Sequence, residues 1–129
     1  MMLIDSEVEC LECEFRKQSF GQARSLVTMA YESTYRGPYL EMKLSLLDVE
    51  GVTFVHEQCL PSFYDNRNRE IFIRTFERFT EAWGVRDDEP YDDIAERLVG
   101  AVALAKVRRR MPFSELPYAY SIFEWVVQE

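Results

Sequence analysis

The chain has 129 residues and a formal net charge of −8, with 47% hydrophobic and 29% charged residues. This length fits one domain with a modest core, and the hydrophobic fraction excludes an intrinsically disordered protein. No apolar run approaches the ~20 residues of a membrane span, and the N-terminus lacks the features of a secretory signal, so we expect a cytoplasmic protein without membrane association.

The first twenty residues are acidic and partly alternating. Val8 and Cys10 have the spacing of a short strand, but the same stretch also fits a loosely held arm. Both alternatives stay open, so residues 1–20 are an acidic N-terminal arm or an extra strand. We expect the OB-like domain proposed below to occupy residues 21–129, with Gly21 as its start.

Five strand-like runs follow along the chain. The clearest is Tyr39–Val49, in which apolar residues alternate with polar ones and thereby predict one buried and one wet face. The turn residues Arg36-Gly37-Pro38 precede it, and Asp48–Gly51 turns the chain back. The five predicted strands are Gln22–Thr34, Tyr39–Val49, Val52–Leu60, Leu98–Arg110 and Ala119–Gln128.

One helix is predicted, over Asn66–Trp83. Large aromatic residues recur there at spacings of four, three and four, which places them on one helical stripe. Gly84 suits the position that follows a helix, and residues 85–97 are expected to form an acidic connector with a short helical turn. We expect the stripe to plug the open end of a small barrel rather than to hold a ligand. Its residues are Phe72, Phe76, Phe79 and Trp83.

The order of these elements predicts the fold class. The chain is expected to be mainly β with one helix, in the order β-β-β-α-β-β of an OB-like β-barrel. In that barrel the loops after the first strand and before the last strand flank the face that binds oligonucleotides.

The spacing of cysteine and histidine raises a zinc alternative. Cys10 and Cys13 have the spacing of a zinc knuckle, and His56 and Cys59 match it. However, neither pair carries the glycine that usually lets a knuckle turn, and His56 and Cys59 point to opposite faces of a regular strand. The competing interpretation is partly buried thiols and a surface histidine. We favour this second interpretation and expect no metal or other cofactor.

Nucleophilic catalysis has little support in the sequence. A serine or cysteine nucleophile needs an adjacent base, and His56 is the single histidine. The sequence lacks the G-x-S-x-G, P-loop and G-x-G-x-x-G motifs. Acidic runs such as Asp87-Asp88-Glu89 are typical of solvated connectors. We therefore do not expect an enzyme.

Basic and aromatic residues gather at both loop positions of the expected barrel. Single strands are held by a positive groove and by aromatic platforms on which the bases stack. The net charge opposes such binding, since phosphate contacts dominate the affinity, but the acid is concentrated in two blocks away from the basic run Lys106–Arg110. The predicted nucleic-acid-binding residues are Tyr35, Arg36, Tyr39, Lys43, Arg108, Arg109, Arg110, Phe113, Tyr118 and Tyr120.

Four short segments also match a known pattern. They are Arg36-Gly37-Pro38-Tyr39-Leu40, Phe79–Val85, Leu98-Val99-Gly100 and Ser121-Ile122. With them, the chain from Gly21 onward resembles a family of small phage-encoded proteins of replication and recombination modules. The resemblance implies an OB-fold protein that binds single-stranded DNA non-specifically in the host cytoplasm. Its implied partners are single-stranded DNA and phage or host replication and recombination proteins.

Two other function classes stay open. The net charge also fits an acidic phage accessory protein that binds a host protein, as an inhibitor or a DNA mimic. The apolar C-terminal strand also fits a small structural virion protein, in which it would be an assembly edge of a homo-oligomer. Under the arm alternative, the acid of the arm would compete with DNA for the basic groove, and deletion of residues 2–17 would tighten DNA binding.

Overall fold

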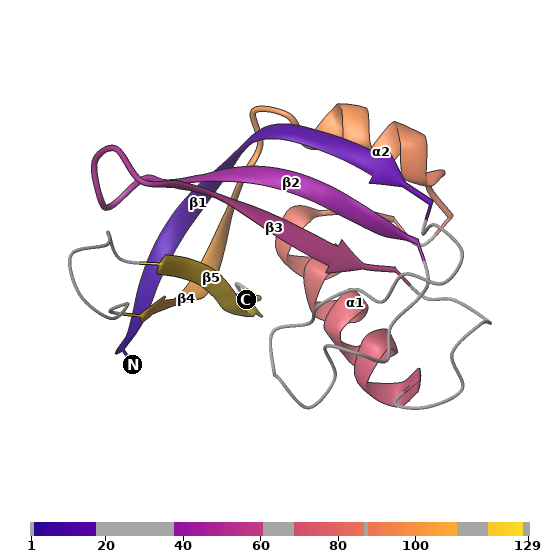
Figure 1. Cartoon of the computed structure of the whole chain (residues 1–129). Helices are drawn as coiled ribbons and strands as arrows, with labels where there is room; N and C mark the ends of the chain where they lie inside the picture. Colours follow the sequence, from indigo (N-terminus) through magenta and orange to yellow (C-terminus); the bar gives the residue numbers. More distant parts are fainter. Residues whose placement is uncertain (1, 18–37, 61–68, 87, 111–118, 128–129) are drawn as a thin grey trace.

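The computed structural model describes residues 2–17, 38–60, 69–86, 88–110 and 119–127, the side chains of residues 69–72 excepted (Figure 1). Its elements are β1 (Met2–Arg16), β2 (Tyr39–Leu46), β3 (Thr53–Cys59), α1 (Arg69–Trp83), α2 (Tyr91–Leu98), β4 (Val102–Arg110) and β5 (Ala119–Val126). No helix in these ranges is both long and apolar enough to span a membrane.

The five strands form one antiparallel sheet in the order β3-β2-β1-β4-β5. The sheet curls into a half-barrel, with β3 and β5 as its two edges (Figure 1). The long strand β1 stands in the centre, because its first part, Met2–Glu9, pairs with β4 and its second part, Val8–Arg16, pairs with β2. The fold is therefore mainly β and resembles a barrel, as predicted.

The N-terminal segment is thus a strand and not an arm. Ser6, Val8 and Cys10 are buried in alternation with wetter neighbours, so β1 presents one face to the core. The strand alternative holds for residues 2–16, and a domain that began at Gly21 would lack the strand that joins both halves of the sheet. The predicted strand Gln22–Thr34 lies outside the described residues.

A β-bulge interrupts β1 at its middle. The register with β2 shifts between Cys10 and Glu12, so β1 carries one extra residue there. A bulge bends a strand and increases its twist. The bend lies where β1 passes from β4 to β2, which is where the sheet must curl.

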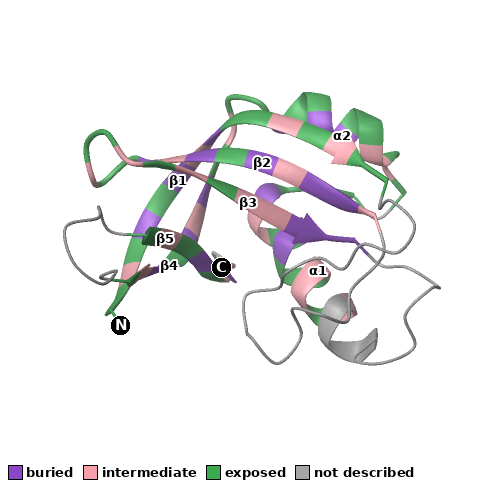
Figure 2. Cartoon of the chain, in the orientation of Figure 1, coloured by how far each residue is buried: buried purple, intermediate pink, exposed green. Residues whose placement is uncertain are grey.

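The core fills the inside of the curl and extends to α1 (Figure 2). The Trp125 ring of β5 lies 6.0 Å from Phe79 and 5.3 Å from Trp83, measured between ring centroids. Phe76 is half-buried and stacks on Phe79 at 6.0 Å. The described part of the aromatic stripe therefore packs into the core, as expected of a plug, and the side chain of Phe72 lies outside the described residues.

The described chain has a second full helix where a connector with only a short helical turn was expected. Tyr91–Leu98 forms α2, whose buried side carries Ile94, Ala95 and Leu98 and packs on β1. Asp92 and Asp93 in its first turn and Arg97 in its last turn suit the helix dipole. The prediction of one helix is therefore wrong. Because α2 extends to Leu98, β4 begins only at Val102 and not at Leu98.

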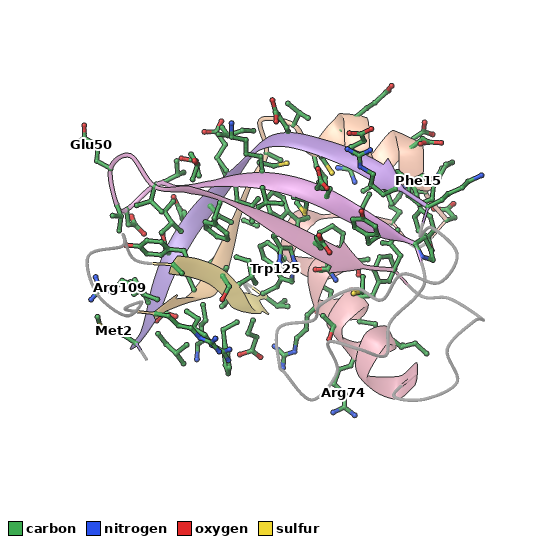
Figure 3. All side chains as sticks on the ribbon, in the orientation of Figure 1. Met2, Phe15, Glu50, Arg74, Arg109 and Trp125 are labelled. Carbon is green, nitrogen blue, oxygen red and sulfur yellow. The ribbon has the colours of Figure 1, made fainter. Side chains whose placement is uncertain are left out.

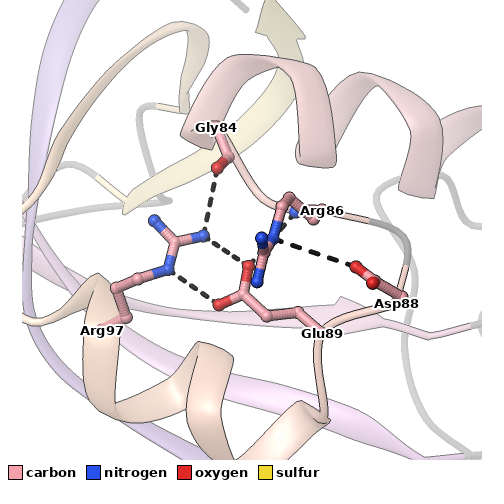
Figure 4. Close-up of polar contacts among 5 residues, drawn as sticks. All are labelled: Gly84, Arg86, Asp88, Glu89 and Arg97. Carbon is pink, nitrogen blue, oxygen red and sulfur yellow. Dashed lines mark hydrogen bonds and ion pairs between the residues drawn. The ribbon is translucent and has the colours of Figure 1, made fainter.

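A polar network fixes α2 to the end of α1 (Figure 4). Arg97 donates through Nε and Nη2 to the two carboxylate oxygens of Glu89, at 2.8 and 2.9 Å, and its Nη2 also donates to the carbonyl oxygen of Gly84 at 3.1 Å. The hydrogen bond from Arg97 lowers the pKa of the Glu89 carboxyl. Gly84 has a φ of +68°, which the residue after a helix commonly adopts.

Candidate nucleic-acid interface

β3 and β5 are the two edge strands of the sheet. In the described residues they are joined by side-chain contacts and not by strand pairing. Phe54 and Tyr120 stack with their ring centroids 6.5 Å apart and an interplanar angle of 27°. Further along, the indole Nε1 of Trp125 donates to Gln58 Oε1 at 2.8 Å, and the His56 ring meets Trp125 edge-on at 5.4 Å. We call these five residues the seam.

The polar part of the seam fixes the protonation of His56. Its Nε2 lies 3.1 Å from Gln58 Oε1, an oxygen that can only accept, so Nε2 carries the proton. The amide nitrogen of Gln58 donates to the carbonyl oxygen of Cys59, which sets the orientation of the amide group. Burial lowers the pKa of His56 to about 4, so the ring is neutral at pH 7.

This lowered pKa predicts a pH dependence of stability. In the unfolded chain the imidazole has its ordinary pKa of about 6.5, so between pH 6.5 and 4 the unfolded state binds more protons than the folded state. Neutral His56 makes its full contribution to the unfolding free energy above pH 6.5, and the protein loses this contribution as the pH falls toward 4. At pH 5 we expect this loss to be about 2 kcal/mol of unfolding free energy.

Urea unfolding of the wild type and of His56→Gln at pH 7 and pH 5 measures this loss. The glutamine keeps a donor toward Gln58 but does not titrate, so the wild type should lose more stability than the variant. Equal losses in both proteins would mean that His56 is not the responsible group.

A basic and aromatic cluster lies at one end of the sheet. Met2, Arg109 and Tyr120 are opposite one another across β1, β4 and β5, and Tyr120 stacks on Phe54. The guanidinium Nη2 of Arg109 donates to the thioether sulfur of Met2 at 3.7 Å, and both residues lie together in Figure 3. Phe54, Arg109 and Tyr120 are half-buried and Met2 is exposed. We call these four residues the sheet-end cluster.

The other basic residues of β4 differ in their surroundings. Arg108 is only 7% exposed, and its guanidinium lies over the Phe123 ring, 5.1 Å from the centroid, so it packs against this exposed aromatic. Lys106 is exposed but stands between Asp5 of β1 and Glu124 of β5. Arg110 is exposed and lies opposite Ala119, on the other face of β4 from Arg109. Of these three residues, Arg108 is packed against a ring, Lys106 is flanked by two carboxylate residues, and Arg110 is exposed.

Lys43 stands on an acidic surface. It is exposed on the outer face of β2, opposite Glu12 of β1 and Val55 of β3. Arg16, at the edge of this face, forms ion pairs with Glu14 at 2.9 Å and with Glu41 at 3.6 Å. The carboxylates on this outer face of β1, β2 and β3 are Glu9, Glu12, Glu14, Glu41 and Glu57. We call this surface the acidic face.

The remaining predicted residues do not add to a single groove. Tyr39 is 3% exposed, in a row with Arg16 and Cys59, so its ring is not open for stacking. Tyr35, Arg36, Phe113 and Tyr118 lie outside the described residues. Of the ten predicted positions, the described structure brings Arg109 and Tyr120 together, places Arg110 next along β4 on the opposite face of the strand, and places Lys43 elsewhere.

The zinc site is not assembled. Among the described residues, which include all three cysteines and the histidine, no three His, Cys, Asp or Glu side chains gather as metal ligands. Cys10 and Cys13 lie on β1, His56 belongs to the seam, and Cys59 is buried opposite Tyr39. Burial raises the pKa of the Cys59 thiol, which keeps it protonated.

Sequence reasoning missed Phe54 and the acidic face. Phe54 is the ring on which Tyr120 stacks, and it lies in the predicted strand Val52–Leu60, but the assignment of a strand does not indicate its partner. The acidic face was missed because residues 1–20 were not assigned to a strand. The alternation of Glu7 and Glu9 with Val8 and Cys10 was the signal that pointed to it.

Two comparisons with known proteins bear on this site. Neither the protein-family models nor the curated protein sequences contain a match to this chain.

Proposed function

We propose that this protein is an OB-like barrel that binds single-stranded DNA non-specifically through the sheet-end cluster and Arg110. One observation carries the proposal: Arg109 lies in one row with Tyr120, which stacks on Phe54, and the exposed Arg110 follows at the end of β4, on the other face of the strand. The sequence resemblance supplies the setting, namely replication or recombination of a phage or mobile element in the host cytoplasm.

The strand arrangement supports the OB-like part of the proposal. A five-stranded OB barrel has a first strand shared between the second and the fourth, a helix after the third, and the third and fifth strands side by side. Here β1 pairs with both β2 and β4, α1 follows β3, and the seam joins β3 to β5. The bulge in β1 provides the bend that such closure needs.

The chemistry of the sheet-end cluster suits single strands. Unpaired bases expose both faces and stack on aromatic rings, with about 1–3 kcal/mol for each stacked base. Tyr120 and Phe54 offer such rings, and guanidinium groups of Arg109 and Arg110 suit the phosphates between the bases. These contacts read no base edge, so we expect no sequence preference and weaker binding of duplex, whose bases are stacked internally.

The acidic face limits where the DNA can run. Phosphates near Glu12, Glu41 and Glu57 would be repelled, and the single charge of Lys43 does not offset these carboxylates. The proposed path therefore stays at the β4–β5 end of the sheet. Arg108 contributes by holding Phe123, and Tyr39 by packing, rather than by contacting DNA.

Substitutions at the sheet-end cluster test the proposal. Tyr120→Leu should lower the affinity for a labelled dT oligomer of about 30 nucleotides by about 1–3 kcal/mol, roughly 5- to 150-fold, because leucine keeps apolar volume but offers no ring. Arg109→Ala/Arg110→Ala should also weaken binding and should reduce the salt slope by about 0.7 for each lost phosphate contact. Fluorescence anisotropy at several salt concentrations, against matched duplex, measures both.

Lys43→Ala is the matched control. It removes one exposed charge from another part of the sheet and should leave the affinity and the salt slope nearly unchanged. Absence of binding by the wild type at low salt would overturn the proposed function. Equal losses in Lys43→Ala and Arg109→Ala/Arg110→Ala would instead overturn its location.

A second candidate rests on the acidic face. Five carboxylates over three adjacent strands, with Val55 exposed among them, fit an accessory protein that binds a basic surface of a host protein as an inhibitor or a DNA mimic. This candidate is favoured if the wild type does not bind single strands but displaces DNA from a basic host DNA-binding protein. Glu12→Gln/Glu41→Gln/Glu57→Gln should then weaken the displacement.

A further inference from the structure

The β-bulge places two cysteines on the same side of β1. Residues three apart normally point to opposite faces of a strand. Here the extra residue between Cys10 and Cys13 makes both side chains point to the inner side of the sheet. Cys10 lies opposite Leu44 and Cys13 lies opposite Met42, and these two residues of β2 are fully buried. The bulge thus turns a C-x-x-C sequence on a strand into a pair of neighbouring thiols.

The two thiols are neighbours on the inner side of β1 and differ in access. Cys10 Sγ donates to the carbonyl oxygen of Glu12 at 3.3 Å. The interaction with Cys13 lowers the pKa of the Cys10 thiol, whereas the interaction with Cys10 and burial raise the pKa of the Cys13 thiol. Cys10 is fully buried, whereas Cys13 is partly exposed beside the exposed residues Leu11 and Glu12.

We propose that Cys10 and Cys13 form a redox-active dithiol, which a low-molecular-weight disulfide such as oxidised glutathione converts into an intramolecular disulfide. The inference goes beyond the proposed function and does not depend on DNA binding.

The reaction proceeds by two thiol–disulfide exchanges. In the first and slower exchange, Cys13 is the attacking residue because it is the accessible one, although its pKa is raised. Its sulfur loses its proton and attacks one sulfur of glutathione disulfide, and one glutathione leaves as a thiolate that takes up a proton. In the second, the Cys10 thiolate attacks the Cys13 sulfur of the mixed disulfide and expels the second glutathione. The protein loses two hydrogens and two electrons, and one glutathione disulfide becomes two glutathiones.

The third cysteine is separated from this pair. Cys59 lies on β3, with β2 between it and β1, and it is 3% exposed. A dissolved disulfide has little access to a thiol that is buried to this degree. Cys59 is therefore the internal control.

The test is incubation of the folded protein with oxidised glutathione, followed by acid quenching, intact mass and peptide mapping. The wild type should lose two hydrogens, retain one of its three thiols and carry no lasting glutathione. Cys10→Ser should accumulate one glutathione on Cys13, because the resolving thiol is absent. Cys13→Ser should stay unmodified over the same time, because Cys10 is buried, and Cys59→Ser should form the disulfide like the wild type.

Peptide mapping of the wild type decides the outcome even where a variant folds poorly. A disulfide that links residues 10 and 13, reversed by reduced glutathione, supports the proposal. Two products would overturn it: a lasting glutathione adduct on wild-type Cys13, or a disulfide that includes Cys59. It would also be overturned if the folded protein kept all three thiols under conditions in which the urea-unfolded protein reacts.

Discussion

Deleting residues 2–17 is expected to leave a chain that does not fold. The deletion removes β1, the strand that pairs with both β2 and β4, and it exposes the inner edges of both neighbours. It also removes the buried side chains of Val8 and Cys10 from the core. Circular dichroism should show no cooperative thermal transition for the truncated chain, and its amide NMR spectrum should lose dispersion. Tighter DNA binding by this chain, which an arm would predict, is not expected.

Single substitutions on β1 separate a folding effect from an effect of chain length. Val8→Asp puts a carboxylate into the core and should cost several kcal/mol of unfolding free energy, because a buried charge without a partner is strongly disfavoured. Glu9→Asp, one residue away on the outer face, should change stability by less than about 0.5 kcal/mol. A truncated chain with a wild-type melting transition would show that the rest of the sheet forms without β1.

Replacing Trp125 with alanine is expected to lower the unfolding free energy by about 3–5 kcal/mol. Trp125 is 2% exposed and contacts the rings of Phe79, Trp83 and His56, so its removal leaves a cavity where α1, β3 and β5 meet (Figure 3). Urea denaturation at pH 7 measures the change. The loss is large relative to the stability of an ordinary domain, so the variant should melt far below the wild type.

Two further variants give this prediction its controls. Trp125→Phe keeps an aromatic ring but removes the Nε1 donor to Gln58, and it should cost about 1–3 kcal/mol for the hydrogen bond. Val55→Ala, at a side chain that is 61% exposed, should change stability by less than about 0.5 kcal/mol. If Trp125→Ala and Val55→Ala had similar effects, the seam would not be part of the core.

Strands with a clear alternation could be predicted from the sequence, whereas central and short elements could not. The pattern of Leu40, Met42 and Leu44 located β2, and its predicted face is the buried one. β1 has the same alternation, but its outward positions are occupied by acid, which also fits an arm. The eight residues of α2 gave too short an amphipathic pattern to outweigh the acidic composition around them.

The roles of the basic residues depend on features that composition does not encode. Arg108 and Arg109 are adjacent in sequence, yet one lies over the Phe123 ring and the other beside Met2. The side of the sheet on which each arginine lies depends on the register of β4. This register with β5 shifts between Lys106 and Val107. The surroundings of Lys43 depend in the same way on which strand pairs with β2. Such pairings between distant segments are set by tertiary structure and cannot be read from a run of like charges. The run predicted a basic groove, and the described residues form only part of it.

The central place of β1 also has a consequence for how the chain reaches its native state. Pairing of Glu9 with Val102 closes a loop of about ninety residues, which is entropically demanding before other contacts have formed. During synthesis β1 can join β2 and β3, but its other edge must wait until β4 has left the ribosome. The folding transition should therefore be slow for a domain of this size. Until β4 is available, the unpaired edge of β1 is the part of the nascent chain most prone to aggregation.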